Sequence, residues 1–399
     1  MLRARLLDVT RLVSRLGRGP LTGIDRVELA YLTRFLADEA PLFALVRSAA
    51  GFLLLDRRGC TGLLTLVQSQ IALPPADRLS RLLYRRDPLR GRSETAARKL
   101  AIARASRFGL WRLLRRLPKA ACYYNIGHTN LTARGLGRLR AAGLGVVVMI
   151  HDTIPLDYPE FSRPDTVASF RRKLAAVGAC ADAVVHLTQA TRSATEAQLA
   201  RLGRVPPGLV APLGVEVALP DASSLPPDLD LSVPYFIALG TIEPRKNHRL
   251  LLDVWAQMVG PVPRLYILGR RGWAAPDLLS RLDALPPGGA VRELPGLSDG
   301  AVAALLAGAV ALLAPSRAEG FGLPPVEAAR LGTSVVASDL PVTRELLGNK
   351  AVYLPPDDIY SWLETVVRLL NTPASRQTSP DPAIRLTWAD HFNTVLRDG

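Results

Sequence analysis

The side chains best suited to chemistry lie in residues 315–331, which read PSRAEGFGLPPVEAARL. The apolar run 310–314 before them predicts a buried parallel strand, and residues 324–331 predict a helix with proline in its first turn. Between strand and helix, two glycines allow close approach of a ligand, and a helix start attracts phosphate. The carboxylate of Glu319 beside such an anion site is suited to sugar hydroxyls. The alternative is a buried turn in which Glu319 only caps the helix.

Two adjacent cations, Arg245 and Lys246, follow another predicted strand, residues 235–239. Arginine offers a planar fork and lysine a point charge, a combination that suits a diphosphate. Alone, such a pair is more often solvated surface. Ligands of open α/β sheets bind beyond the carboxyl ends of the strands. The occurrence of the Arg245–Lys246 pair together with the Glu319 loop therefore favours one shared site for phosphate and sugar.

The first half of the chain offers a weaker set of candidates. The apolar run 145–150 predicts a strand covered on both faces, and His151 and Asp152 follow it directly. A single histidine is usually structural, but this strand-end position favours a role in a site. Gly23 and Ile24 lie where a glycine-containing turn enters a predicted helix, residues 24–36, which is a weak phosphate-loop signal.

The alternation of predicted strands and helices along the 399 residues indicates an α/β protein with parallel sheets. Residues 206–234 are rich in Pro, Asp, Ser and Gly and predict a linker. We therefore expect a first domain over residues 1–212 and a second over 213–380. We expect a final helix within 381–399 to pack back on the first domain.

The formal net charge of +15 is concentrated in residues 78–119, which hold 14 basic and two acidic residues. Leucines and aromatic residues lie among these charges, so the segment predicts an interfacial helical region attracted to anionic lipid. A solvated arginine-rich loop is the alternative; no nucleic-acid motif accompanies the charge, so we expect no nucleic-acid partner.

Other features of the sequence favour the cytosol. The three cysteines, Cys60, Cys122 and Cys180, have neither metal-ligand nor disulfide spacing. The N-terminus lacks the apolar core of a signal peptide. The longest uncharged apolar run, residues 301–314, is too short to span a bilayer.

Two motifs of the second half, GTIEPRKN at 240–247 and EGFGLPPVE at 319–327, resemble the retaining glycosyltransferases of family 4. In the first half, TGIDRV and HDTIPLDYPEF are similar to bacterial mannosyl-, rhamnosyl- and fucosyltransferases that build O-antigen, capsule or exopolysaccharide. The resemblance implies a GT-B fold, in which two Rossmann-like parallel-sheet domains face each other across a cleft. The first domain would take the acceptor and the second the nucleotide sugar.

The resemblance also implies a role for each matching residue. Arg245 and Lys246 would hold the donor diphosphate, Glu319 the sugar hydroxyls and Glu327 the ribose, while His151 would position the reacting groups. The implied catalytic residues are His151, Glu319, Arg245 and Lys246. The implied donor-binding residues are Gly23, Ile24, Gly240, Arg245, Lys246, Leu297, Glu319, Gly320, Phe321, Gly322, Leu323 and Glu327. Some family members have an arginine where Thr241 stands, so one cationic contact is missing or is supplied elsewhere.

The implied reaction is transfer of a hexose, with retention and without a metal or other cofactor. Mannose from GDP-mannose is the preferred donor, with UDP- and dTDP-sugars left open. The acceptor would be a glycan, preferably polyprenyl-linked, at the inner face of the plasma membrane. Two alternatives are an epimerase or hydrolase that acts on the nucleotide sugar alone, and a non-catalytic glycan- or lipid-binding scaffold.

Overall fold

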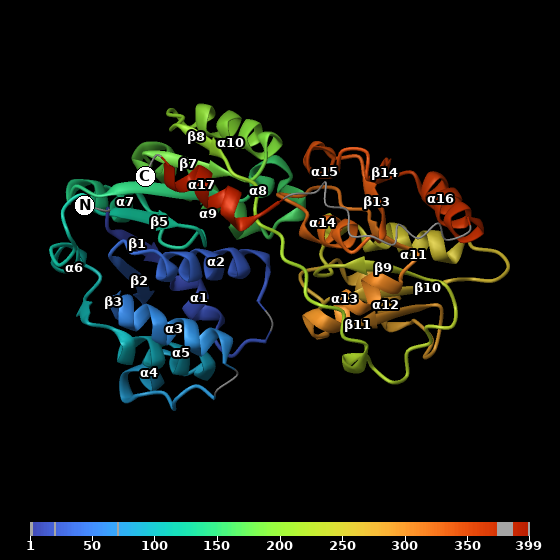
Figure 1. Ribbon diagram of the computed structural model, residues 1–399, viewed down its shortest axis with the longest axis horizontal. Coiled ribbons are helices and arrows are strands. Elements are labelled where there is room, and N and C mark those ends of the chain that lie inside the picture. Colours follow the sequence, from blue (N-terminus) through green and yellow to red (C-terminus); the bar gives the residue numbers. More distant parts are fainter. Residues whose placement is uncertain (1–2, 20, 70–71, 373–385, 398–399) are drawn as a thin grey trace.

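The protein consists of two α/β domains placed side by side, each with a central sheet between layers of helices (Figure 1). The computed structural model describes residues 3–19, 21–69, 72–372 and 386–397. A cleft lies between the two domains and is lined by residues of both. The predicted fold class, two parallel-sheet domains facing each other across a cleft, is confirmed in outline.

The first domain has an eight-stranded sheet with the order β4-β3-β2-β1-β5-β6-β7-β8. Its strands are β1 (Arg5–Asp8), β2 (Leu42–Ser48), β3 (Gly51–Asp56), β4 (Ala103–Ala105), β5 (Cys122–Asn125), β6 (Gly145–Ile150), β7 (Ala183–His186) and β8 (Gly208–Val210). Its helices are α1 (Thr10–Arg15), α2 (Gly23–Ala37), α3 (Arg57–Gln68), α4 (Arg78–Leu83), α5 (Pro88–Leu100), α6 (Leu110–Leu114), α7 (Ala133–Ala141), α8 (Ile154–Asp157), α9 (Pro164–Cys180) and α10 (Gln189–Arg201). The central strand β6 is buried on both faces, as its continuous apolar run predicts.

The second domain has a six-stranded, fully parallel sheet with the order β11-β10-β9-β12-β13-β14. Its strands are β9 (Tyr235–Leu239), β10 (Arg264–Leu268), β11 (Val291–Leu294), β12 (Ala311–Ala314), β13 (Ser334–Ser338) and β14 (Ala351–Leu354). Its helices are α11 (His248–Ala256), α12 (Pro276–Asp283), α13 (Asp299–Gly308), α14 (Leu323–Arg330), α15 (Pro341–Leu347) and α16 (Ile359–Asn371). Since β9 and β12 are neighbours in the sheet, the loops that follow them lie side by side.

The expectation of purely parallel sheets is wrong for one edge of the first domain. Strands β2 and β3 pair antiparallel, as do β3 and β4. Only Ala49 and Ala50 separate Ser48 of β2 from its partner Gly51 of β3. Because a parallel pair needs a crossover of a dozen or more residues, so short a connection can only form a hairpin.

The predicted linker begins too early. Residues 208–210 form β8, which pairs with β7 at the edge of the first sheet. A composition rich in proline and glycine is compatible with an edge strand, which needs hydrogen bonds on one side only. The chain then crosses to the second domain, with a single 3₁₀ turn at Ala222–Ser224.

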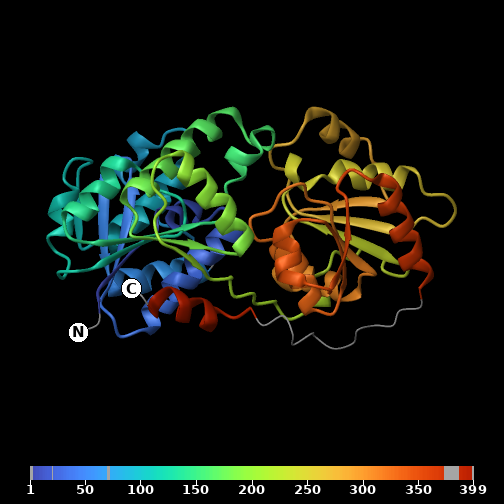
Figure 2. The same cartoon turned by 90° about the horizontal axis from the view of Figure 1, so that it is seen from above.

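The last described helix, α17 (Trp388–Arg397), returns to the first domain, and both cartoon views show it there (Figures 1 and 2). His391 packs between α2 and the chain after β8: its ring contacts the Tyr31 hydroxyl at 2.8 Å and the Ala211 carbonyl at 3.1 Å. Residues 373–385 of the polar segment before this helix lie outside the described residues.

The basic segment 78–119 is not one interfacial helical region. It forms α4, α5, β4 and α6, and α5 is largely buried. Arg98 is 4% exposed and its Nε donates to Asp77 at 3.1 Å, while Glu94 is fully buried beside Tyr84. Part of the charge therefore belongs to the interior of the domain, which composition alone does not reveal.

Candidate active site

A cleft of about 840 Å³ separates the carboxyl edges of the two sheets. It is formed by residues that directly follow β6, β9, β10, β11 and β12, together with the start of α2. Every residue that the sequence singled out for a site lines this cleft: Gly23, Ile24, His151, Gly240, Arg245, Lys246, Leu297, Glu319, Gly320, Phe321, Gly322, Leu323 and Glu327. The structure thus brings together groups that are up to 304 positions apart, from Gly23 to Glu327.

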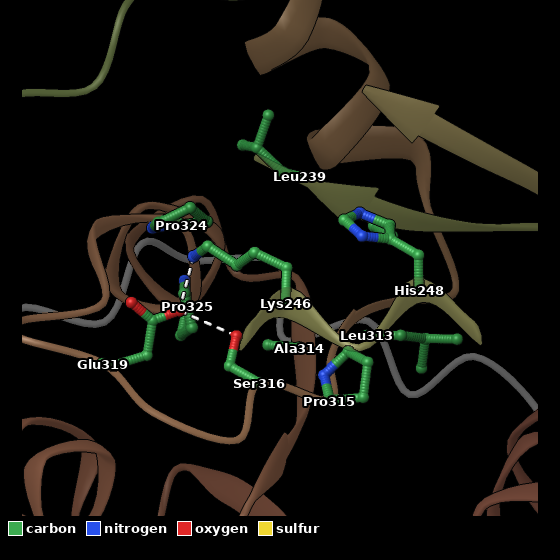
Figure 3. A pocket seen from close by; sticks show the side chains of 11 residues that line it. Leu239, Lys246, His248, Leu313, Ala314, Pro315, Ser316, Glu319, Pro324 and Pro325 are labelled. Atoms are coloured by element: carbon green, nitrogen blue, oxygen red, sulfur yellow. Dashed lines mark hydrogen bonds and ion pairs between the residues drawn. The ribbon is translucent and has the colours of Figure 1, made fainter. Parts of the chain in front are cut away.

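Glu319 is the centre of a buried charge cluster in the second domain. Its carboxylate accepts hydrogen bonds from Arg245 Nη1 at 2.8 Å, from Ser316 Oγ at 2.7 Å and from Lys246 Nζ. Figure 3 shows Lys246 and Ser316 pointing at this carboxylate. Burial raises the pKa of Glu319, but the attraction of Lys246 and Arg245 outweighs it and lowers that pKa to about 2. Glu319 is therefore ionised at any physiological pH.

The local backbone explains why these side chains meet. Pro244 starts a 3₁₀ turn, and Asn247 ends it in the left-handed region at φ 56°, with its side-chain amide donating to the Pro356 carbonyl at 2.8 Å. The Arg317 N–H donates to the Arg245 carbonyl at 2.7 Å. This bond ties the loop after β9 to the loop after β12. The cations and the carboxylate are thus positioned by the backbone as well as by mutual attraction.

Glu327 takes part in a second cluster that joins the two domains. Arg26 of α2 donates to Glu327 at 3.2 Å and to Asp299, at the start of α13, at 2.7 Å. Burial raises the pKa of Glu327, and Arg26 opposes that rise. The sequence predicted Glu327 as a site residue but gave no sign that Arg26 would be its partner, because the two are 301 positions apart.

The start of α2 forms the opposite wall of the cleft. A capping box joins Thr22 and Asp25, and the Thr22 N–H donates to the Asp25 carboxylate at 2.8 Å. Gly23 faces Leu323 of the second domain, since a Cβ at Gly23 would lie 3.4 Å from Leu323 Cδ1. Arg11 lines the same wall and pairs with Asp25 at 2.7 Å.

His151 lines the cleft but is only 6% exposed. Its Nε2 lies 2.8 Å from the Ile126 carbonyl, which can only accept, so Nε2 carries the proton and Nδ1 is left as an acceptor. Burial lowers the pKa of His151 to about 4. A neutral imidazole of this tautomer can accept a hydrogen bond from a substrate hydroxyl, which agrees with a positioning role.

Histidine burial leads to a prediction about acid stability. His151, His186, His248 and His391 each have a pKa of about 4, lowered by burial from the ordinary 6.5. Between pH 6.5 and 4 the unfolded chain binds protons that the folded chain does not. The contribution of these histidines to stability is therefore complete above pH 6.5 and is lost as pH falls through this window, by up to about 1.4 kcal/mol per pH unit for each histidine.

The measurement is the free energy of unfolding in urea between pH 7 and 5, where most unfolded-state carboxylates stay ionised. His186 is fully buried and neither of its ring nitrogens has a hydrogen-bond partner in the described chain. The variant His186→Met should flatten the pH slope, by up to about 1.4 kcal/mol per pH unit. An unchanged slope in the variant, or no loss of stability in the wild-type protein, would contradict the prediction.

Sequence reasoning missed several groups of the cleft. The charged ones that it did not single out are Arg11, Arg26, Glu243, Arg270 and Asp299, whereas Asp152 was named beside His151 without a specific role. A usable signal existed for Glu243 and Arg270, because both follow predicted strands of the second domain as Arg245 does. For Arg11 there was none, since it lies within a helix and reaches the cleft only through the packing of the first domain. Arg26 lies in the motif TGIDRV, which carried the resemblance but gave this arginine no role.

Residues 226–380 match the protein-family model described as "Glycosyl transferases group 1". The chain is similar to the serotype-specific mannosyltransferase WbdA of Escherichia coli, with 29% identity over 281 residues, 65% of this chain and 34% of that protein. It is also similar to the O-antigen chain mannosyltransferase RfbU of Salmonella typhimurium (strain LT2), with 34% identity over 142 residues, 35% of this chain and 39% of that protein. The chain thus spans about a third of the length of the curated relatives with the longest match.

Solved structures resemble the whole chain. The crystal structure of Anabaena Alr3699/HepE in complex with UDP has a TM-score of 0.61 at 16% identity, covering 98% of this chain and 95% of that one. The sucrose-phosphate synthase from Thermosynechococcus elongatus has a TM-score of 0.62 at 15% identity, covering 98% and 96%. At such identities the likeness shows the fold alone.

Proposed function

We propose that this protein transfers a hexose from a nucleotide sugar to a glycan, because residues 226–380 match the model of group 1 glycosyl transferases and the whole chain shares its fold with the solved structures above. The observation that carries the proposal is the cluster of Arg245, Lys246 and Glu319 at two adjacent strand ends, facing a cleft between the domains. In the proposal, the two cations bind the diphosphate and the ionised carboxylate beside them binds sugar hydroxyls.

The cluster fits the charge changes of the reaction. Breaking the bond between sugar and phosphate leaves negative charge on the departing nucleotide, and preorganised cations stabilise that charge. Arg245 and Lys246 would act on the leaving diphosphate, and the start of α14 would present backbone N–H groups to it. We include in the proposal that no metal is required. Equal transfer rates with and without EDTA would support this part.

Retention at the anomeric carbon is the second part of the proposal. We infer a front-face displacement in which the leaving phosphate oxygen takes the proton of the acceptor hydroxyl. In this proposal His151 would orient the acceptor hydroxyl through Nδ1, because its Nε2 proton is held by the Ile126 carbonyl. The anomeric configuration of the product, determined by NMR, tests this part. An inverted product would contradict front-face displacement but not the proposed transfer of the sugar.

The donor sugar is proposed to be mannose, carried as GDP-mannose. The support is the resemblance of the first half and the mannosyltransferase names of the relatives. Thermal shift with GDP, UDP and dTDP and with their sugars, followed by transfer assays on the sugars that bind, decides it. A protein that binds none of these nucleotides would contradict the proposed function. Binding followed by hydrolysis or epimerisation without an acceptor would replace it.

The acceptor is proposed to be a polyprenyl-linked glycan at the inner face of the plasma membrane. Within the described part of the chain, no helix is long and apolar enough to cross a bilayer. The support for surface binding is an exposed aromatic and basic patch around α6, made of Phe108 and Trp111 with Arg107, Arg112 and Arg115. The arginines lie over the two rings, with their Cζ atoms 4.7–5.7 Å from the ring centroids.

Liposome binding tests the membrane proposal. The protein should sediment with phosphatidylglycerol vesicles at low salt and not with phosphatidylcholine vesicles, because each basic residue near an anionic surface contributes about 1 kcal/mol. The double variant Phe108→Ser and Trp111→Ser should weaken this binding roughly tenfold or more, from the lost apolar burial. Val259→Ser is the control, since Val259 is 97% exposed but lies on the other domain. Equal weakening by both variants, or binding indifferent to lipid charge, would contradict the proposal.

A further inference from the structure

Basic and acidic side chains line the cleft in equal numbers, but not all of them form ion pairs. Five are basic and five acidic. Four of the basic ones bind carboxylates: Arg11 binds Asp25, Arg26 binds Glu327 and Asp299, Arg245 binds Glu243 and Glu319, and Lys246 binds Glu319. Among the residues that the structure describes, Arg270 is the one basic side chain of the cleft with no hydrogen-bond or ion-pair partner.

The backbone holds Arg270 at the strand end next to the diphosphate cations. A Cβ on Gly269 would lie 2.1 Å from the Gly240 carbonyl oxygen, so the ends of β9 and β10 touch there in a way that only glycine permits. The Ile242 N–H donates to the Arg270 carbonyl at 3.0 Å. Thr241 packs its methyl group against Gly272, where a Cβ would lie 2.5 Å away. Arg270 thus emerges directly beside Thr241.

A diphosphate that enters this cleft needs a cation that is not already neutralised. The charges of Arg245 and Lys246 are matched by Glu243 and Glu319, so together they offer directed N–H donors but little net charge. Leaving the charge of a bound phosphate uncompensated in a partly dry site is costly. An arginine supplies the missing charge together with a fork that fits two phosphate oxygens. Thr241 beside it has no charge to contribute.

We propose that Arg270 is a phosphate-binding residue of the donor site, which supplies the unpaired positive charge for the nucleoside diphosphate. The inference rests on the proposed function and adds to that same site a cation beyond Arg245 and Lys246. Arg270 is the counter-charge of the donor diphosphate, and Arg245 and Lys246 fix its geometry.

Calorimetric binding of GDP, GMP and guanosine to the full chain, and of the corresponding uridine series, tests the assignment. Arg270→Gln should weaken binding of the diphosphate roughly 10- to 100-fold, as expected for a lost charge-assisted hydrogen bond, and should leave nucleoside binding unchanged. Arg270→Lys should restore part of the loss, because the charge returns without the fork. The wild-type affinity for the diphosphate should also fall more steeply with salt than that of Arg270→Gln.

The matched control is Arg271→Gln. Arg271 is the next residue, but its guanidinium binds Glu293 at 2.5 Å and Asp283 at 2.6 Å and does not line the cleft. Its diphosphate affinity should equal that of the wild-type protein. Equal affinity of Arg270→Gln and wild type for the diphosphate overturns the inference and leaves the proposed function intact. An equal loss for nucleoside and diphosphate assigns Arg270 to the base and also overturns it. A wild-type chain that binds no nucleotide overturns both.

Discussion

Replacing Lys246 by alanine should lower the rate of sugar transfer by about 100- to 1,000-fold, the cost of losing one preorganised donor to a developing negative charge. Lys246 donates to Glu319, which also accepts from Ser316, so its ammonium is held in position to meet the leaving phosphate without rearrangement. In the variant, Glu319 keeps its ion pair with Arg245 at 2.8 Å, so its buried carboxylate is not left without a counter-charge. The fold should therefore survive.

The assay is turnover at saturating donor, accompanied by thermal melting to show that the variant is folded. Arg249→Ala is the control on the adjacent helix α11, since the Arg249 side chain is 52% exposed and pairs with Asp277 on the surface. Its turnover should match the wild-type value. A folded Lys246→Ala protein with turnover within about threefold of wild type would remove the diphosphate site assignment, because that change is far below the loss expected for a preorganised donor.

Replacing Gly320 by alanine should reduce transfer roughly 100-fold by keeping the domains apart, since misplacing the reacting groups by about 1 Å has effects of this size. A Cβ on Gly320 would lie 2.6 Å from the His151 carbonyl oxygen and 2.9 Å from an Asp152 carboxylate oxygen. Both atoms belong to the other domain, and the first is backbone that cannot turn aside. Gly320 is not among the residues with positive φ, so alanine fits its local conformation.

Small-angle X-ray scattering with and without nucleotide would report the separation of the domains. Gly320→Ala should show a larger radius of gyration than the wild-type protein in both states, with little change in melting temperature. Gly137→Ala is the matched control, because a Cβ at Gly137 in helix α7 meets nothing within 4 Å. Wild-type dimensions and wild-type transfer in Gly320→Ala would show that productive catalysis does not need this contact between the domains.

The sequence predicted the second domain well because most of its strands are short, largely apolar runs, each followed by its own loop. In a parallel sheet all such loops emerge at the same edge, so strand order alone brings Arg245 close to Glu319. The sheet confirms this, since β9 and β12 are neighbours. The roles of the predicted site residues stay predictions, and the variants above address them.

The first domain was predicted less well, and the reasons are local. The two-residue turn at Ala49–Ala50 converts one sheet edge to antiparallel pairing, while the alternation of strands and helices suggested parallel strands throughout. From the sequence, the arginines of residues 78–119 were expected to form one basic patch on the surface. Burial of Arg98 against Asp77 and Ser80 is a property of how α4 and α5 pack, which net charge does not report.

What the sequence determined by itself is which loops carry chemistry, because strand ends and glycine turns are encoded over a few neighbouring residues. What only the tertiary structure decided is which charges remain available once the loops meet. Arg26 and Arg270 are both arginines near the ends of elements, yet Arg26 is neutralised by Glu327 and Asp299 from the other domain, and Arg270 has no partner among the residues that the structure describes. Ion pairing depends on distances of about 3 Å between segments hundreds of positions apart, and only the packed fold sets those distances.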